Sequence, residues 1–415
     1  MRTRIACSGA LLTVLAAPAV AGEAVVLRVG KVLTMNPRDE VIDDAVVVVR
    51  KGRIAAVGRR GEVREPEGAR VHERPDAWLL PGFVDCHNHT AGSLRNLNDG
   101  VWLTNPGLRT VDTLVPESED LRDALAGGVT SVLLIPGSGN NMSGFGTVVR
   151  TAGRTAAAMV RRAPGSLKVA QAGNPERYWF GVGRRYMNWN LEQTLRKARA
   201  YHERWCRWEE AVAVQGRDAA GPPPEKDLLW EDFRPLFRRE IPVSVHTQIY
   251  QVVLETLRML HDRFRLRVVL DHSTFDAYKL APLVVERGVA TIVGPRQYYF
   301  DRSERRIVGI AARYRAAGVR ELGLNTDAPV VPQEELTLQA AIGCRLGLDG
   351  YTALRALTIV PARALGIDGQ VGSVEVGKEA DLAVWTGDPI DPREHCLLTF
   401  SRGELVYDAA HGRRF

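Results

Sequence analysis

Cysteine is scarce in this chain, with five among 415 residues. No C-x-x-C pair occurs, so the sequence lacks the close thiol pairs that are typical of zinc sites and thioredoxin-like redox motifs. Four of the cysteines lie beyond residue 21, at Cys86, Cys206, Cys344 and Cys396. Four are too few for a disulfide framework in so long a chain, although an oxidising compartment would permit one bridge.

The chain also lacks internal repeats, low-complexity tracts and blocks of like charge. Its 55 Lys and Arg residues are scattered among 49 Asp and Glu residues, so the net charge of +6 does not indicate a nucleic-acid partner. No G-x-G-x-x-G follows a predicted strand, which leaves a dinucleotide site without support. The composition, 45% hydrophobic and 25% charged, is typical of a globular protein.

The first 21 residues are typical of a secretory signal peptide. Arg2 and Arg4 provide a positive start, residues 5–20 are apolar, and residues 19–21 form an A-x-A cleavage site. The apolar run is shorter than the about 20 residues that a membrane span needs. We expect cleavage after Ala21 and a periplasmic or secreted mature protein with no membrane partner, an uncleaved anchor being the alternative. Because cleavage removes two arginines and no acid, the net charge would fall from +6 to +4.

Short segments rich in β-branched residues lie at both ends of the chain and predict strands of a small β-layer. They cover residues 25–29, 46–49, 53–57, 381–385 and 405–407. The long middle part of the chain has a different pattern, in which short apolar runs alternate with helical segments. Strands are predicted at residues 82–85, 129–135, 167–170, 243–246, 268–271, 290–293 and 322–325, with a further candidate at 148–149.

Helical patterns separate these runs, at residues 120–126, 191–208 and 254–264. The alternation predicts parallel βαβ units and therefore an α/β fold. About eight such units in residues 81–365 fit a (β/α)₈ TIM barrel, with a doubly wound open sheet as the alternative. The helix at 191–208 mixes aromatic residues with arginines, as a nucleic-acid face would. Its apolar spacing of three to four residues is more simply the buried stripe of an outer barrel helix.

Histidine and aspartate occupy the ends of several predicted strands. His87 and His89 would point to the same face, because side chains alternate along a strand. His246 and His272 each end an apolar run, and Asp327 follows another. The carboxyl ends of barrel strands form the mouth of the active site. Imidazole and carboxylate ligands suit zinc or another divalent transition metal, so the sequence predicts a metal site; the alternative for the H-x-H pair is two polar residues that cap a strand.

These segments resemble the amidohydrolase superfamily of metal-dependent hydrolases. The similar motifs are PGFVDCHNH around residue 85, VSVHTQ at 243–248, LDHSTFDAYKLA at 270–281, LNTDAPV at 324–330 and GSVEVGKEADLAVW at 372–385. The run GVTSVLLIPGSGNNMSGFG is similar to the imidazolonepropionase-related branch. The resemblance covers nearly the whole chain after residue 21. It implies a TIM barrel of residues 81–365 and a small composite β-sandwich domain of residues 22–80 plus 366–415.

The resemblance also implies a role for each residue at the strand ends. The matches to metal ligands are His87, His89, His246, His272 and Asp327. Asp327 in addition matches the aspartate that carries the proton. Lys168 matches a lysine that is carboxylated and bridges two metals in binuclear members, a surface lysine at the start of a strand being the alternative. One or two divalent cations per chain are therefore expected, with zinc favoured.

The implied reaction is hydrolysis of a C–N bond in a small-molecule amide, cyclic amide or dipeptide-like substrate, by metal-activated water with Asp327 as the proton shuttle. Mononuclear deaminases on the same fold are the first alternative. They usually place a carboxylate soon after the strand-five histidine, and residues 247–251 contain none. The second alternative is a secreted barrel that binds a ligand without catalysis.

Substrate choice would lie in the loops that follow the strands. The candidates are Asn140, Asn141, Arg184, Arg185, Tyr278 and residues 296–299. An arginine at the mouth could hold a substrate carboxylate in a bidentate pair. The sequence leaves open the identity of the substrate and whether the chain forms a homo-oligomer.

Overall fold

Two large sheets organise the structure, a computed structural model that describes residues 24–413 apart from 93, 172 and 178–180. The predicted signal peptide therefore lies outside the described residues. The smaller sheet has seven strands in the order β17-β16-β15-β4-β1-β2-β3. Their bounds are β1 Val25–Leu33, β2 Val41–Arg50, β3 Arg53–Arg59, β4 Arg70–Pro81, β15 Leu382–Trp385, β16 Cys396–Ser401 and β17 Glu404–Asp408.

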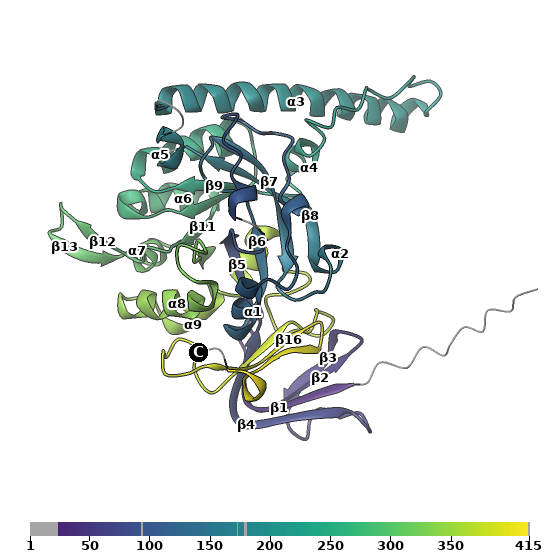
Figure 1. Cartoon of the computed structure of the whole chain (residues 1–415), viewed down its shortest axis with the longest axis vertical. Helices are drawn as coiled ribbons and strands as arrows, with labels where there is room; N and C mark the ends of the chain where they lie inside the picture. The colour runs from purple at the N-terminus through teal and green to yellow at the C-terminus, as the bar shows by residue number, and fades with distance from the viewer. Residues whose placement is uncertain (1–23, 93, 172, 178–180, 414–415) are drawn as a thin grey trace, which may run out of the picture.

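This seven-stranded sheet is built from both ends of the described chain (Figure 1). Strand β4 joins the two parts, because it pairs with β1 on one side and with β15 on the other. One hydrophobic cluster contains residues of both parts, among them Leu27, Val47, Leu79, Leu382 and Phe400. The sheet thus encloses a core that neither end of the chain could form alone.

The second sheet has eight strands in the order β14-β11-β10-β9-β8-β7-β6-β5. Their bounds are β5 Phe83–Asn88, β6 Val129–Leu134, β7 Met142–Arg150, β8 Val160–Ala170, β9 Val243–Thr247, β10 Val268–His272, β11 Ala290–Val293 and β14 Leu322–Leu324. A parallel bridge between Asn88 and Ala328 and a hydrogen bond from His89 N to Ala328 O (2.9 Å) connect its two edges. The sheet is therefore a nearly closed barrel, which confirms the predicted α/β fold class.

The expectation of parallel βαβ units throughout is wrong at β7, which is antiparallel to both β6 and β8. The connection between β6 and β7 spans only residues 135–141. A parallel return needs a crossover of about a dozen residues or more, so this short connection can only reverse the chain. All other neighbouring pairs in this sheet are parallel.

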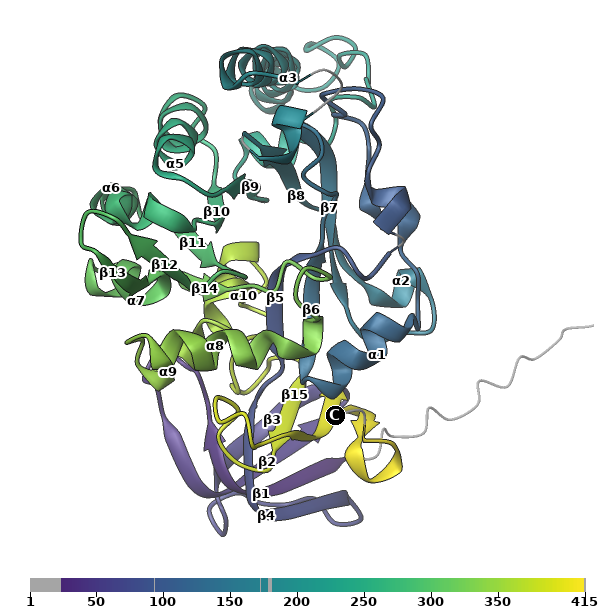
Figure 2. The same ribbon diagram turned by 60° about the vertical axis from the view of Figure 1, so that its left-hand side comes forward.

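The helices lie mainly outside the barrel strands, as Figure 2 shows for α3, α5, α6, α7 and α8. The α-helices are α1 Glu119–Ala126, α2 Ala156–Met159, α3 Arg184–Gln215, α4 Phe233–Phe237, α5 Tyr250–Thr256, α6 Ala281–Arg287, α7 Ile310–Ala316, α8 Leu336–Arg345, α9 Gly350–Arg355 and α10 Ile359–Leu365. A π-helical segment, Leu257–Arg263, continues α5. Short 3₁₀ segments are Leu94–Leu97, Thr110–Thr113, Asn174–Arg177, Phe275–Leu280, Gln333–Glu335 and Ala409–His411. A hairpin of β12 (Tyr298–Asp301) and β13 (Arg306–Gly309) projects from the barrel.

Helix α3 shows the buried stripe that its sequence predicts. Leu191, Leu195 and Ala198 are fully buried, whereas Arg196 and Arg204 are exposed. None of the described helices combines the length and the hydropathy that a membrane crossing requires. The four cysteines in the described part of the chain are all free thiols, so no disulfide joins them.

Candidate metal centre

The predicted metal-binding residues come from five strands of the barrel. His87 lies in β5 and His89 directly after it, while Lys168 lies in β8. His246 lies near the end of β9, His272 ends β10, and Asp327 follows β14. The structure brings all six of these residues together, namely His87, His89, Lys168, His246, His272 and Asp327.

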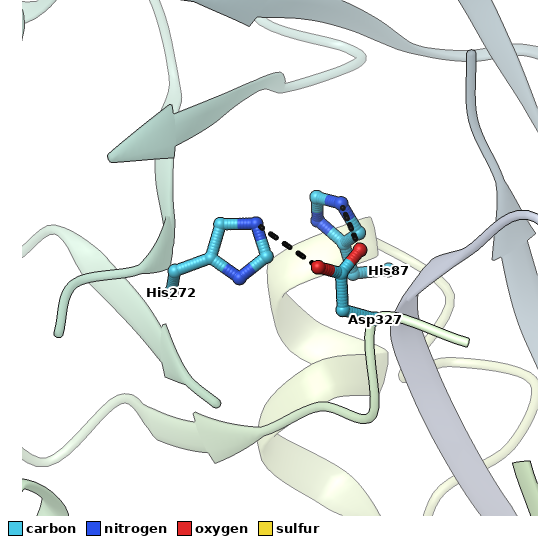
Figure 3. A group of neighbouring side chains, drawn as sticks. All are labelled: His87, His272 and Asp327. Atoms are coloured by element: carbon cyan, nitrogen blue, oxygen red, sulfur yellow. Dashed lines mark ion pairs between the residues drawn. The ribbon is translucent and has the colours of Figure 1, made fainter. Parts of the chain in front are cut away.

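Asp327 lies at the centre of this group. Its Oδ1 atom is 3.3 Å from both His87 Nε2 and His89 Nε2, and its Oδ2 atom is 4.0 Å from His272 Nε2. Figure 3 shows the side chains of His87, His272 and Asp327 pointing toward one another. Their ligand atoms all lie within 4.8 Å of one another, a spacing at which one cation could contact all three.

Hydrogen bonds to backbone carbonyls orient two of the imidazoles. His89 Nδ1 is 2.8 Å from Ile135 O, and His272 Nδ1 is 2.8 Å from Gly294 O. A carbonyl oxygen can only accept, so each Nδ1 carries the proton. Each Nε2 then presents a lone pair on the side of Asp327. Such outer hydrogen bonds fix the tautomer and the ring orientation in metal sites.

His246 gives an independent test of whether these residues fit a cation. Its ring lies 4.4 Å from the His272 ring, and its side chain is buried. Neither of its ring nitrogens has a hydrogen-bond partner among the described residues, and the same is true of His272 Nε2. Burying polar atoms without a partner costs about 1–3 kcal/mol each, so such atoms call for a ligand. A divalent cation would be such a ligand, and imidazole nitrogen is a donor that zinc accepts.

The electrostatics of the site favour neutral imidazoles. Burial, helped by the charge of neighbouring Lys168, holds the pKa of His87 and of His246 well below the usual value. Burial also lowers the pKa of His272. A neutral imidazole keeps the lone pair that a metal requires, whereas a protonated one does not. These three rings are therefore already in the state that binds a cation.

The two charged members of the group respond differently to burial. Burial lowers the pKa of Lys168 to about 8, although Asp271 and Asp327 oppose the shift. Burial alone would raise the pKa of Asp327, but His272, His89 and Lys168 outweigh it and bring that pKa below the usual value. Asp327 is thus an ionised carboxylate at neutral pH, while Lys168 reaches its neutral form more easily than a surface lysine does.

Two buried carboxylates beside the site were not among the residues predicted from the sequence. Asp271 is fully buried, and its Oδ2 atom is 3.1 Å from His87 Nδ1. Strand alternation would place Asp271 on the face opposite to His272. That rule fails here because His272 has a φ of 66°, outside the extended region, so both side chains reach the site. In the sequence, this carboxylate could have been found as the acidic residue directly before the histidine that ends a predicted strand.

The second missed carboxylate, Asp85, holds two parts of the site together. It accepts hydrogen bonds from His87 N (2.9 Å), from Thr326 N (3.1 Å) and Oγ1 (2.7 Å), and from Gln333 Nε2 (2.8 Å). These donors lie on β5 and on the segment after β14 that carries Asp327. Asp85 therefore fixes the spacing between His87 and Asp327.

A cavity of about 460 Å³ opens beside this group and is lined by both His272 and Asp327. Of the predicted loop residues, Arg296, Gln297 and Tyr298 line it. Asn140 and Asn141 instead donate to the backbone carbonyls of Asp99 (2.7 Å) and Ala170 (2.9 Å). A larger cavity, about 890 Å³, lies between α1 and the β16–β17 turn and contains none of the predicted site residues.

The other predicted loop residues lie away from this cavity. Arg184 pairs with Glu176 at 2.6 Å, and the Tyr278 hydroxyl donates to Asp301. Arg184 and Arg185 line a separate cavity of about 350 Å³ between α3 and α5. Arg296 and its neighbours are therefore the candidates that share a cavity with the predicted metal centre.

Comparison with known proteins agrees with this fold. The amidohydrolase family profile matches residues 285–409. The amidohydrolase tasK of Hapsidospora irregularis is 27% identical over 378 residues, which cover 83% of this chain but only 38% of that protein. The imidazolonepropionase of Pseudomonas entomophila is 26% identical over 375 residues, covering 84% of this chain and 89% of the relative. The crystal structure of an amidohydrolase from Thermotoga maritima superposes with a TM-score of 0.81 at 27% identity, covering 92% of this chain and all of the other.

Fold, site and relatives together define a metal-dependent hydrolase that acts on C–N bonds. The comparisons support the amidohydrolase superfamily for this chain, with imidazolonepropionases among its relatives.

Proposed function

We propose that this chain is an exported enzyme that hydrolyses a C–N bond in an amide, cyclic amide or dipeptide-like small molecule. The observation that carries the proposal is the convergence of three buried imidazoles, those of His87, His89 and His272, on the ionised carboxylate of Asp327. The buried ring of His246 lies beside that of His272. His87, His89, His246, His272 and Asp327 would hold a divalent cation, for which the nitrogen and oxygen donors favour zinc. When bound, such a cation lowers the pKa of water and polarises a carbonyl group.

Asp327 is proposed to move the proton in this reaction. Its carboxylate is ionised and lines the cavity beside His272, so it can take a proton from the attacking water. It would then deliver this proton to the nitrogen of the leaving group, as a general acid. His89 and His272 carry their protons on Nδ1, held by the carbonyls of Ile135 and Gly294. Their Nε2 lone pairs would be given to the cation, so these rings would not compete for that proton.

Lys168 is proposed to complete a second cation position. Its Nζ atom lies 3.0 Å from His87 Nε2, where an ammonium group would repel a metal bound to that nitrogen. Carboxylation would turn Lys168 into an anionic oxygen ligand and would remove this conflict. A pKa of about 8 supports the proposal, because only a neutral amine can react with carbon dioxide.

Hydrolysis is favoured over deamination by the lining of the cavity. After His246, the residue that lines it is Gln248, an amide that cannot act as an acid. Asp327 is the only carboxylate among the described lining residues. One carboxylate is enough for a single proton relay in amide hydrolysis.

Export to the periplasm or the medium is proposed from residues 1–21 alone. N-terminal sequencing of the mature protein tests it. A start at Gly22 would support signal cleavage, and a retained Arg2 would contradict it.

The experiment for the catalytic proposal replaces one unpartnered imidazole. His246→Ala should lose bound zinc, by about 10-fold or more in affinity, and hydrolysis should fall by at least as much, while circular dichroism stays unchanged. Metal content and turnover of a panel of small amides are the measurements. His411→Ala is the matched control, because His411 is exposed and far along the chain from the site. Full activity in His246→Ala would overturn the proposed mechanism.

A further inference from the structure

Arg296 is the one cationic side chain among the described residues that line the cavity beside His272 and Asp327. It lies in the connection between β11 and β12, at the carboxyl end of a barrel strand. Loops in this position carry substrate contacts in TIM barrels. The position of Arg296 therefore makes it a candidate for substrate recognition.

Arg296 has no acidic partner within 4.0 Å in the part of the chain that the structure describes. Nearby cations differ from it in this respect, since Arg306 and Arg313 pair with Glu304 and Lys279 pairs with Asp301. Among the described lining residues the only carboxylate is that of Asp327, and it lies against the imidazoles of the predicted metal centre. The charge of Arg296 is thus left without an internal counterion.

Two aromatic rings hold the guanidinium group of Arg296. Its Cζ atom lies 5.5 Å from the centre of the Phe275 ring and 5.9 Å from that of Tyr298, which are cation–π distances. Both rings line the same cavity. A guanidinium restrained in this way loses less conformational freedom when it binds a planar anion.

The remainder of the cavity wall is suited to an apolar group. Val330, Val331 and Ile342 line it together with Phe275. A ligand that fills this space would therefore combine an apolar body with an anionic group beside Arg296. A carboxylate matches the planar fork of arginine with two parallel hydrogen bonds.

We propose that Arg296 binds a carboxylate of the substrate. The preferred substrates are then acyclic amides with a free acid and an apolar side chain, such as N-acyl amino acids or dipeptides, rather than neutral cyclic amides. This inference rests on the proposed function, because it assigns the substrate class of the same site.

A matched pair of substrates isolates the carboxylate. N-acetylphenylalanine carries it, and N-acetylphenethylamine has the same body without it. Arg296→Met should lower kcat/KM about 10- to 100-fold more for the acid than for the neutral analogue, and Arg296→Lys should lie between Met and the wild type. Arg302→Met, in the exposed β12–β13 turn, is the control and should leave this ratio unchanged. An equal loss on both substrates, or no loss, would overturn the inference.

A binding measurement separates this inference from the proposed function. Isothermal titration of the metal-loaded protein with 3-phenylpropionate and with 3-phenylpropanol needs no turnover. Binding of the propionate should weaken about 10-fold or more in Arg296→Met, while binding of the alcohol changes less. If wild type binds the acid through Arg296 but cleaves no amide, the carboxylate site stands and the hydrolase proposal fails. If neutral amides are cleaved, and Arg296→Met changes neither the kcat/KM ratio of the acid to the neutral substrate nor the binding of 3-phenylpropionate, the hydrolase proposal stands and the carboxylate site fails.

Discussion

Lys168 and His87 place an amine and an imidazole nitrogen, predicted to bind a metal, only 3.0 Å apart in the interior of the barrel. If carboxylated Lys168 bridges two cations, protein purified with bicarbonate should hold about two zinc ions per chain, and Lys168→Ala should hold about one. Metal analysis of both proteins measures this directly. Lys279→Ala is a suitable control, because Lys279 is partly exposed and pairs with Asp301 outside the site. An unchanged metal content in Lys168→Ala would show that Lys168 is not a bridging ligand.

At the scale of single residues, the sequence predicts the residues that converge on the site better than it predicts the neighbouring side chains that position them. His87, His246, His272 and Asp327 could be assigned because the carboxyl ends of neighbouring strands in a barrel converge at one mouth. Asp271 could not be assigned, because strand alternation places its side chain on the face opposite to that of His272. The left-handed φ of His272 breaks this alternation, so both side chains reach the site. Asn140 was a candidate by its place in a loop, whereas its amide is taken up by a backbone carbonyl.

At the scale of elements, the apolar pattern and the turn signals located all eight barrel strands, but the predicted parallel direction was wrong for β7. The direction of β7 depends on how many residues connect it to β6, and the predicted strand at residues 148–149 was too short to define that connection. Strand β4 was missed for another reason. Its first half is largely exposed and contains Pro75, so it has no period-two apolar pattern, and pairing with β1 and β15 makes it a strand.

Gly30 shows how β1 accommodates the irregular part of β4. The register between the two strands shifts at this point, and a Cβ atom at Gly30 would lie only 2.2 Å from Pro75 O. Glycine is thus required by a close approach of two backbones. A contact of this kind joins residues 45 positions apart, so no local pattern in the sequence could reveal it.

For the whole molecule, the pairing of the two chain ends was accessible from sequence only through family resemblance. Strands 25–29 and 381–385 each have an apolar pattern, but nothing in either pattern names the other as a partner. The structure places them in one sheet through β4. The two ends then share one buried core, in which Leu79 of the first part and Phe400 of the second belong to the same cluster.

Arg161 joins this small sheet to the barrel and gives a prediction for the stability of the whole molecule. Its side chain is fully buried, and it pairs with Glu379 at 2.6 Å and with buried Asp381. Arg161→Met would leave Asp381 buried without its cation and Glu379 with Arg150 alone. Loss of one partner of a buried ion pair costs about 3–5 kcal/mol, because the remaining charge is uncompensated.

The expected outcome for Arg161→Met is therefore a markedly lower midpoint of urea unfolding, with looser attachment of the small sheet. Arg393→Met is the matched control, since Arg393 pairs with Asp391 but is 85% exposed, and an exposed pair contributes only about 0–1 kcal/mol. The double variant Arg161→Met with Asp381→Asn should recover part of the loss, because it removes the uncompensated charge together with the cation. If Arg161→Met unfolds at the same urea concentration as Arg393→Met, the buried cluster does not hold the two sheets together, and the shared apolar packing must do so.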